Sequence, residues 1–196
     1  MEIKGKKVLV FGSGISGESA AGLLLRKGAR VILYDGNEKL DAEDIRGKIR
    51  ENLTETDSVN GKAPGQTADD CGDPENLSVV LGEFPEELLG GLSLIVMSPG
   101  VPTDLPVVNR MKEAGIPIWG EIELAYVLGK GDVLAITGTN GKTTTTALLG
   151  QIMGNWKEST FVVGNIGNPY TSIVPETRED SVIVAEMSSF QLETVH

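Results

Sequence analysis

The stretch Asp132-Val-Leu-Ala-Ile-Thr-Gly-Thr-Asn-Gly-Lys-Thr-Thr-Thr-Thr146 combines an apolar run, a glycine-rich loop and the start of a helical pattern. Val133 to Ile136 are typical of a short buried strand, and the helical pattern runs from Thr144 through Met153. Glycines let successive backbone N–H groups turn toward an anion, and the positive end of the helix adds to their effect. The stretch therefore predicts a strand, a phosphate-binding loop and a helix in direct succession.

The side chains of this loop suit a nucleotide triphosphate. Lys142 can reach the β- and γ-phosphates, and the Thr143 hydroxyl can bind Mg²⁺. Ile136 stands where the usual G-x-x-x-x-G-K-[ST] spacing has its first glycine, and Gly138 lies closer in. The alternative is a glycine-rich turn that only closes a βα unit. The candidate phosphate-binding residues are Gly138, Thr139, Asn140, Gly141, Lys142, Thr143 and Thr144.

Two further apolar runs, at 160–163 and 181–185, each lead into a polar loop. Both loops are expected to open on the same sheet edge as Lys142. Glu186 follows the second run directly, and a carboxylate there is a natural second anchor for Mg²⁺. The alternative for Glu186 is an acid near the start of a helix around Ser188. Asn165 could equally be a turn former, and Gln191 could face solvent.

The N-terminal part shows a second nucleotide-type pattern. An apolar strand at 8–11 leads into Gly12-Ser-Gly-Ile-Ser-Gly17, a helix follows, and a strand at 31–34 ends at Asp35. This spacing matches the dinucleotide-binding fingerprint, although it does not say which nucleotide binds. Tight helix–strand packing without a ligand is the alternative. The same turn also supports a competing function, a nicotinamide-dependent oxidoreductase.

The remaining elements complete an α/β pattern. Strands are predicted at 77–81, 92–97 and 116–119, a short helical turn at 86–89, and helices at 42–53, 106–115 and 121–128. The turn after the strand at 92–97, Ser98–Gly100, is expected to share a crevice with the Gly12–Gly17 turn. We predict a Rossmann-like parallel-sheet domain at 1–120, followed by a P-loop-type α/β domain at 121–196. The second domain has only three predicted strands, so we expect a truncated part of a longer polypeptide.

Composition restricts the class of partner. The net charge of −11 argues against a nucleic-acid binder, and residues 36–76, with 11 acidic and 5 basic side chains, carry −6 of it. The single cysteine, Cys71, excludes a disulfide framework and fits a reducing cytosol. No signal peptide or membrane-spanning run is present. Residues 60–70 are predicted to form a surface loop, with Asp69, Asp70 and Asp73 as solvated acids and not a metal cluster.

Six motifs in chain order resemble the Mur ligases. The match covers nearly the whole chain except residues 36–76. Its motifs are Gly12-Ser-Gly-Ile-Ser-Gly17, Ser98-Pro-Gly-Val-Pro102, Glu121-Ile-Glu-Leu124, Thr137-Gly-Thr-Asn-Gly-Lys-Thr-Thr-Thr145, Gly164-Asn-Ile-Gly167 and Glu186-Met-Ser-Ser-Phe-Gln-Leu-Glu193. The Ser188–Glu193 run resembles the corresponding run in those members of the family that add D-glutamate to UDP-N-acetylmuramoyl-L-alanine.

The resemblance implies an ATP-dependent ligase of peptidoglycan synthesis. In this family ATP phosphorylates the substrate carboxylate, and an amine attacks the acyl phosphate. The implied cofactors are ATP and Mg²⁺, with Lys142 and Glu186 catalytic and with Thr143 and Glu186 as metal ligands. The implied contacts to the UDP-sugar substrate are Gly14, Ile15, Ser16, Asp35, Ser98, Gly100, Asn165, Ser189 and Gln191.

The phosphate loop alone would not separate such an enzyme from folylpolyglutamate synthetase. The N-terminal βαβ pattern and the Ser188–Glu193 run favour the UDP-sugar ligase. The resemblance implies a cytoplasmic monomer without nucleic-acid or membrane partners. Because the family's D-glutamate site lies in a further C-terminal domain, we expect these 196 residues to bind UDP without catalysing the reaction.

Overall fold

The structure, a computed structural model, describes residues 2–59 and 74–195. The predicted loop at 60–70 and Cys71, Asp69, Asp70 and Asp73 lie outside the described residues. The chain divides into two compact units, Met1–Trp119 and Gly120–His196. Each unit has its own parallel sheet, so the α/β fold class predicted from the sequence is confirmed.

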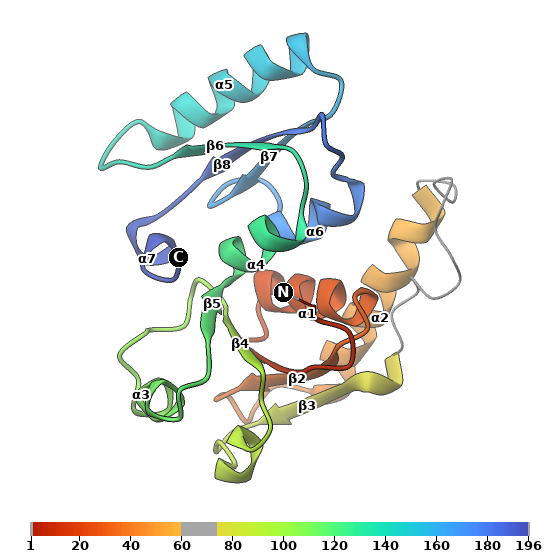
Figure 1. The fold of residues 1–196 in the computed structure, drawn as a ribbon, viewed down its shortest axis with the longest axis vertical. Coiled ribbons are helices and arrows are strands. Elements are labelled where there is room, and N and C mark those ends of the chain that lie inside the picture. Colours follow the sequence, from red (N-terminus) through yellow and green to blue (C-terminus); the bar gives the residue numbers. More distant parts are fainter. Residues whose placement is uncertain (1, 60–73, 196) are drawn as a thin grey trace. The chain divides into compact units, whose positions relative to one another are not determined.

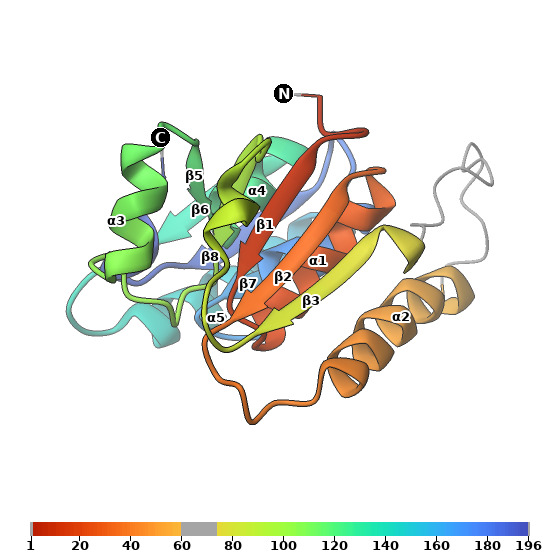
Figure 2. The same ribbon diagram turned by 90° about the horizontal axis from the view of Figure 1, so that it is seen from below.

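The first unit is built on a five-stranded sheet in the order β3-β2-β1-β4-β5. Its paired strands β1–β2, β1–β4 and β2–β3 are parallel, and this strand order is the one found in Rossmann-type folds. Figure 2 shows β1, β2 and β3 side by side. The strands are β1 (Lys7–Phe11), β2 (Arg30–Asp35), β3 (Leu77–Leu81), β4 (Leu94–Met97) and β5 (Ile118–Gly120).

Helices pack on both faces of this sheet, which explains why its strands are apolar without alternation. Leu9, Ile32 and Ile95 lie in one buried cluster with Val108 and Met111 of the third helix. Their strand neighbours point to the opposite face and are buried as well. The helices are α1 (Ile15–Arg26), α2 (Ala42–Val59) and α3 (Pro106–Glu113), with the short turns η2 (Pro74–Asn76) and η3 (Glu86–Leu89).

The second unit has a three-stranded parallel sheet in the order β6-β8-β7. One helix, α5, covers one face, and α4 and α6 lie on the other (Figure 1). The strands are β6 (Asp132–Ile136), β7 (Thr160–Gly164) and β8 (Val182–Glu186). The helices are α4 (Glu121–Leu128), α5 (Lys142–Trp156), α6 (Tyr170–Ile173) and α7 (Ser189–Leu192), with the turn η4 (Val174–Glu176).

Several boundaries differ from the predicted ones. The helix α5 begins at Lys142 and not at Thr144, because Gly141 adopts a left-handed conformation and takes the N-cap position. The helix α2 continues past residue 53 to Val59, and β4 begins at Leu94, two residues later than predicted. The helix α6 was not predicted from the sequence.

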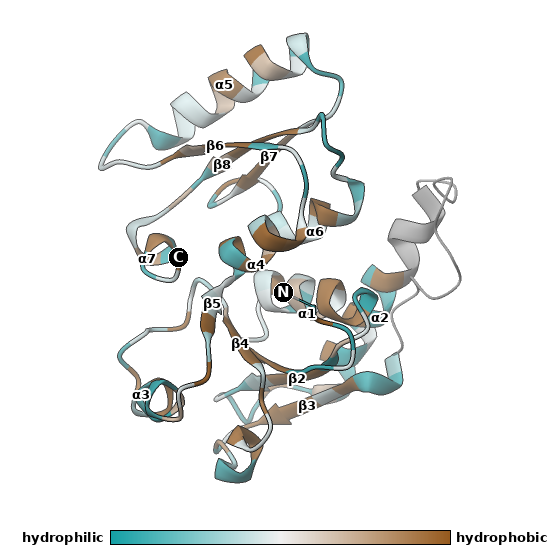
Figure 3. Ribbon diagram, in the orientation of Figure 1, coloured by the Kyte–Doolittle hydropathy of each residue, from teal (hydrophilic) through white to brown (hydrophobic). Residues whose placement is uncertain are grey.

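Apolar residues are concentrated on the strands of the two sheets (Figure 3). Three large hydrophobic residues on α5 are instead exposed to solvent: Leu148, Ile152 and Trp156 are 57%, 53% and 72% exposed. Their spacing of four residues places them along one side of the helix. Among the described residues, no helix combines the length and the apolar character that crossing a bilayer requires.

Candidate functional site

The glycine-rich loop between β6 and α5 has the backbone of an anion site. Gly138 and Gly141 have φ values of +146° and +76°, which residues with a side chain rarely adopt. Lys142 is the first residue of α5, and its Nζ donates a hydrogen bond to the Gly138 carbonyl oxygen at 2.7 Å. The lysine therefore lies across its own loop. Thr143 and Thr144 follow in the first helical turn and are exposed.

Glu186 lies at the same sheet edge as this loop. It ends β8, in register with Ile136 of β6 on one side and Gly164 of β7 on the other. The loop begins one residue after Ile136. The prediction that the loops after all three strands open on one edge is therefore confirmed.

The Glu186 carboxyl group is buried and only partly paired. The residue is 2% exposed, and its Oε2 has no hydrogen-bond partner within the described part of the chain. Its Oε1 accepts a 3.4 Å hydrogen bond from Asn165 Nδ2. A buried carboxylate oxygen without a partner is costly, so the group is suited to an incoming cation. The described residues contain no group of three or more His, Cys, Asp or Glu side chains placed to hold a metal ion. A cation at Glu186 would therefore draw on hydroxyl, phosphate or water oxygens, which suits Mg²⁺.

The loop after β7 is fixed against the end of β8. The Asn165 N–H donates to the Glu186 carbonyl oxygen at 2.9 Å. A Cβ on Gly164 would overlap that same oxygen, so glycine is required there. Asn165 is thereby held next to Glu186 by both its backbone and its side chain.

The segment after β8 caps its own short helix. The Ser188 hydroxyl accepts from the Gln191 N–H, and Gln191 Oε1 accepts from the Ser188 N–H at 2.8 Å. Gln191 is 6% exposed, so the alternative that it faces solvent is wrong. The N-cap of α7 is Ser188 itself. Ser189, the other residue predicted to contact substrate here, is the first residue of that helix.

The glycine turn of the first unit brings β1 close to the start of α1. Gly12 has a φ of +100°, and a Cβ on Gly17 would overlap the Gly12 carbonyl oxygen. Gly14 is the N-cap of α1, followed by Ile15, which is 76% exposed, and Ser16. The three predicted substrate contacts in this turn therefore surround a helix N-terminus, where backbone N–H groups favour an anion.

Asp35 is fixed by hydrogen bonds from two directions. Its Oδ2 accepts from the Ser13 N–H at 2.9 Å and from the Ser13 hydroxyl at 2.7 Å. Its Oδ1 accepts from the Asn37 N–H at 3.0 Å. Burial pushes the pKa of Asp35 upward, but the hydrogen bonds from Asn37 and Ser13 outweigh it and leave the pKa below its ordinary value. Asp35 is thus a carboxylate held in one orientation.

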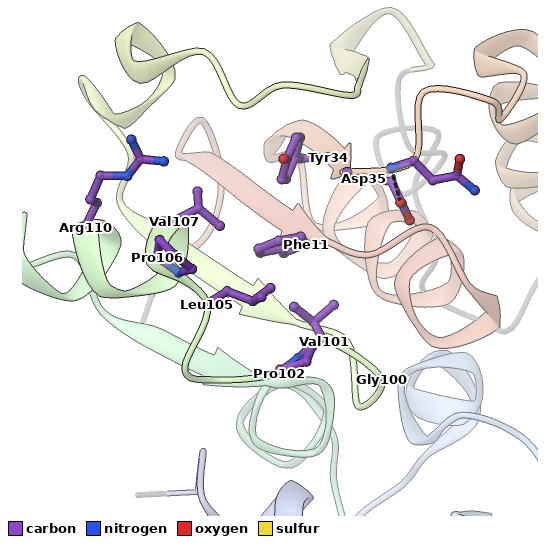
Figure 4. Close-up of a pocket in the computed structure, with 12 residues that line it drawn as sticks. Phe11, Tyr34, Asp35, Gly100, Val101, Pro102, Leu105, Pro106, Val107 and Arg110 are labelled. Carbon is purple, nitrogen blue, oxygen red and sulfur yellow. Dashed lines mark hydrogen bonds between the residues drawn. The ribbon is translucent and has the colours of Figure 1, made fainter.

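A pocket of about 620 Å³ lies beside Asp35 (Figure 4). The rings of Phe11 and Tyr34 contact each other there, with their centroids 4.8 Å apart. Burial and the nearby Asp35 charge raise the pKa of the Tyr34 hydroxyl, which donates to the Gly82 carbonyl oxygen. The other lining residues are Gly36, Asn37, Gly100, Val101, Pro102, Leu105, Pro106, Val107 and Arg110.

The pocket includes Asp35 and Gly100 among the predicted substrate contacts, but not Ser98. The Ser98 hydroxyl is turned inward and donates to the Gly12 carbonyl oxygen at 3.2 Å. This bond ties the two turns together, and the pocket is lined by Gly100 of one turn but by none of residues 12–17 of the other. Tyr34 and Arg110 were missed from the sequence. For Tyr34 the available signal was its place at the carboxyl end of a strand.

Comparison with known proteins gives two family matches. Residues 6–120 match the family described as Mur ligase MurD-like, N-terminal domain, and residues 136–196 match the Mur ligase middle domain. Two curated relatives named UDP-N-acetylmuramoylalanine–D-glutamate ligase come from Lachnospira eligens and Lachnoclostridium phytofermentans. They are 53% and 51% identical over the full chain. The chain spans 38% of the length of each.

A solved structure of a pseudomurein peptide ligase type C from Methanothermus fervidus is also similar. It is 21% identical, with a TM-score of 0.47, and the match covers 93% of this chain and 33% of that one.

Proposed function

The chain belongs to the Mur ligase family, and on that premise we propose that the whole protein adds D-glutamate to UDP-N-acetylmuramoyl-L-alanine. ATP transfers its γ-phosphoryl group to the alanine carboxylate, giving an acyl phosphate and ADP. The amine of D-glutamate then attacks the acyl carbon, so that an amide forms and phosphate leaves. The names of the relatives support this choice of substrates.

We assign the ATP phosphates to the loop from Gly138 to Thr144. Two glycines with positive φ and the N-terminus of α5 support this assignment. Lys142 would exchange its bond to the Gly138 carbonyl oxygen for the β- and γ-phosphates. Phosphoryl transfer depends mainly on positioning and on neutralising charge, so it needs no nucleophilic side chain from the protein.

The observation that carries the proposal is the buried Oε2 of Glu186, which has no hydrogen-bond partner among residues 2–59 and 74–195 and lies at the edge where the phosphate loop begins. We propose that Glu186 and Thr143 hold Mg²⁺. When bound, the ion would neutralise negative charge on the triphosphate. Asn165, which already contacts Glu186, would face the muramoyl-alanine portion, together with Ser189 and Gln191.

The first unit would hold the UDP portion. The pocket beside Asp35 has aromatic and apolar walls that suit a flat base, and its polar groups suit the ribose and the base edge. The N-terminus of α1, at Gly14, Ile15 and Ser16, suits the diphosphate. Ser98 would contribute by holding the Gly12–Gly17 turn in place. We further propose that the protein acts as a cytoplasmic monomer.

The decisive experiment uses the full-length protein and measures ADP release in the presence of UDP-N-acetylmuramoyl-L-alanine, with and without D-glutamate. Lys142→Ala and Glu186→Gln should each lower kcat by about 100-fold or more. The matched control is Asp132→Asn, an exposed acid at the opposite end of β6, which should stay within about twofold of the wild type. ADP release that is independent of both substrates would contradict the proposal.

Two other functions are separated from this one by a binding test and by an activity test. The Gly12–Gly17 turn also fits a nicotinamide cofactor, so NADH binding more tightly than UDP would favour an oxidoreductase. Ligation of glutamate to a folate in place of the UDP-sugar would favour folylpolyglutamate synthetase.

A further inference from the structure

In the second unit, a buried carboxylate away from the proposed ATP site joins the helix α4 to the helix α6. Glu121, the first residue of α4, is 2% exposed. Its Oε1 accepts hydrogen bonds from the Thr171 N–H at 2.6 Å and from the Thr171 hydroxyl at 2.7 Å. The helix α6 has Pro169 at its N-cap and no side-chain cap of its own. Glu121 therefore caps α6 from a helix 50 residues earlier in the chain.

This remote cap fixes the end of the loop that carries Asn165. The loop leaves β7 at Gly164, whose N–H donates to the Asn168 carbonyl oxygen at 3.2 Å, and it enters α6 after Pro169. At its start the loop is fixed to β8, because the Asn165 N–H donates to the Glu186 carbonyl oxygen. The position of Asn165 thus depends on two anchors, Glu186 at one end and Glu121 at the other.

The neighbouring residue holds the segment after β8 in the same way. The Gly120 N–H donates to the Thr194 carbonyl oxygen at 3.3 Å, and a Cβ on Gly120 would overlap Thr194 Oγ1. That hydroxyl in turn donates to the Gln191 carbonyl oxygen at 3.2 Å. The dipeptide Gly120-Glu121 therefore contacts both segments to which the muramoyl side of the substrate is assigned.

We propose that Glu121 is a positioning residue. By fixing the start of α6, it holds the loop of Asn165 in the position that binds the muramoyl portion of the substrate. The inference rests on the proposed ligase function. In this proposal Glu121 acts through its contact with Thr171 and is assigned no contact with a reacting group. The ATP side does not depend on this cap, since the phosphate loop lies between β6 and α5 with its own glycines, and Glu186 is held within β8 by its pairing with β6 and β7.

The test can therefore compare the KM for the UDP-sugar substrate with the KM for ATP. A simple loss of folded protein would change neither KM. In the full-length protein, Glu121→Ala and Thr171→Val should raise the KM for UDP-N-acetylmuramoyl-L-alanine by about tenfold, because a small displacement of a substrate-positioning group is costly. The KM for ATP should stay within about twofold of the wild-type value. Glu121→Gln keeps one oxygen that can accept from Thr171, so it should restore most of the wild-type KM.

The matched control is Thr177→Val. Thr177 is another buried threonine close to α6, and its hydroxyl donates to the Val174 carbonyl oxygen and not to Glu121. It should leave both KM values unchanged even where it lowers the amount of folded protein. An active wild type whose Glu121 and Thr171 variants also keep both KM values would overturn the inference alone. A wild type without D-glutamate-dependent ADP release would overturn the proposed function and this inference with it.

Discussion

The carboxylate of Asp35 is oriented by hydrogen bonds from within the protein itself. Ser13 supplies two of its hydrogen bonds and Asn37 the third, and both come from loops at the carboxyl edge of the sheet. A carboxylate that already accepts three bonds is held in one rotamer, so less side-chain entropy is lost when it meets a ribose hydroxyl. The residue type could be read from the fingerprint spacing, but its partner Ser13 could not.

The lowered pKa of Asp35 leads to a prediction of how the free energy of unfolding depends on pH. Its folded pKa lies below the ordinary value of 3.8, so its contribution to stability is complete above that value and is lost as the pH falls through the lower folded pKa. Asp35→Asn should therefore be less stable than the wild type at pH 7. The difference in free energy of unfolding should shrink as the pH falls below about 4. Urea denaturation of both proteins between pH 7 and pH 3 measures this.

Ser13→Ala provides the companion measurement. It removes the hydroxyl donor and keeps the backbone N–H, so its effect should be smaller than that of Asp35→Asn and should fade over the same pH range. A stability difference for Asp35→Asn that is the same at pH 3 and pH 7 would contradict the account.

At the level of the secondary-structure elements, one glycine controls how closely α1 packs against β1. Gly17→Ala should lower the free energy of unfolding by about 2 kcal/mol or more, because its Cβ would overlap the Gly12 carbonyl oxygen, a backbone atom that cannot turn away. Gly22, on the same helix, is also buried, yet a Cβ there would meet nothing within 4 Å. Gly22→Ala should therefore raise the free energy of unfolding by about 0.5 kcal/mol.

Urea midpoints of the two variants, measured side by side, test this difference in sign. If both substitutions destabilise α1 to the same extent, the close approach of Gly17 to Gly12 is not what makes glycine necessary. The pair also separates packing from helix propensity, since propensity alone predicts a gain at both positions.

The elements differed in how well the sequence predicted them. Uninterrupted apolar runs identified the strands, and β3 and α4 agree with prediction at both ends. The helix α6 has only four residues, and its cap comes from Glu121. No local sequence pattern therefore predicted it. The start of α5 was misplaced because it depends on the left-handed conformation of Gly141. Local propensity describes long regular elements, whereas short ones depend on distant partners.

At the scale of the whole molecule, the prediction of the sites had a similar limit. The carboxyl ends of parallel strands gather at one edge, so Asp35 and Glu186 could be assigned to site edges from their positions after apolar runs. Arg110 could not, because it reaches the pocket through the packing of α3 on the sheet. Residues at strand ends are predictable in this fold, while those from covering helices depend on tertiary packing.

The division into two units gives the last prediction. Every residue that lines the pocket beside Asp35, and the whole Gly12–Gly17 turn, belongs to the unit Met1–Trp119. That unit has its own five-stranded sheet and a core on both faces. A protein of residues 1–120 should therefore unfold cooperatively and bind UDP with a Kd within about threefold of that of the 196-residue chain, as calorimetric titration would measure. Asp35→Asn in the same fragment should weaken binding, which ties the heat signal to the pocket. If the fragment folds but binds UDP only when residues 121–196 are attached, the UDP site does not lie in the first unit.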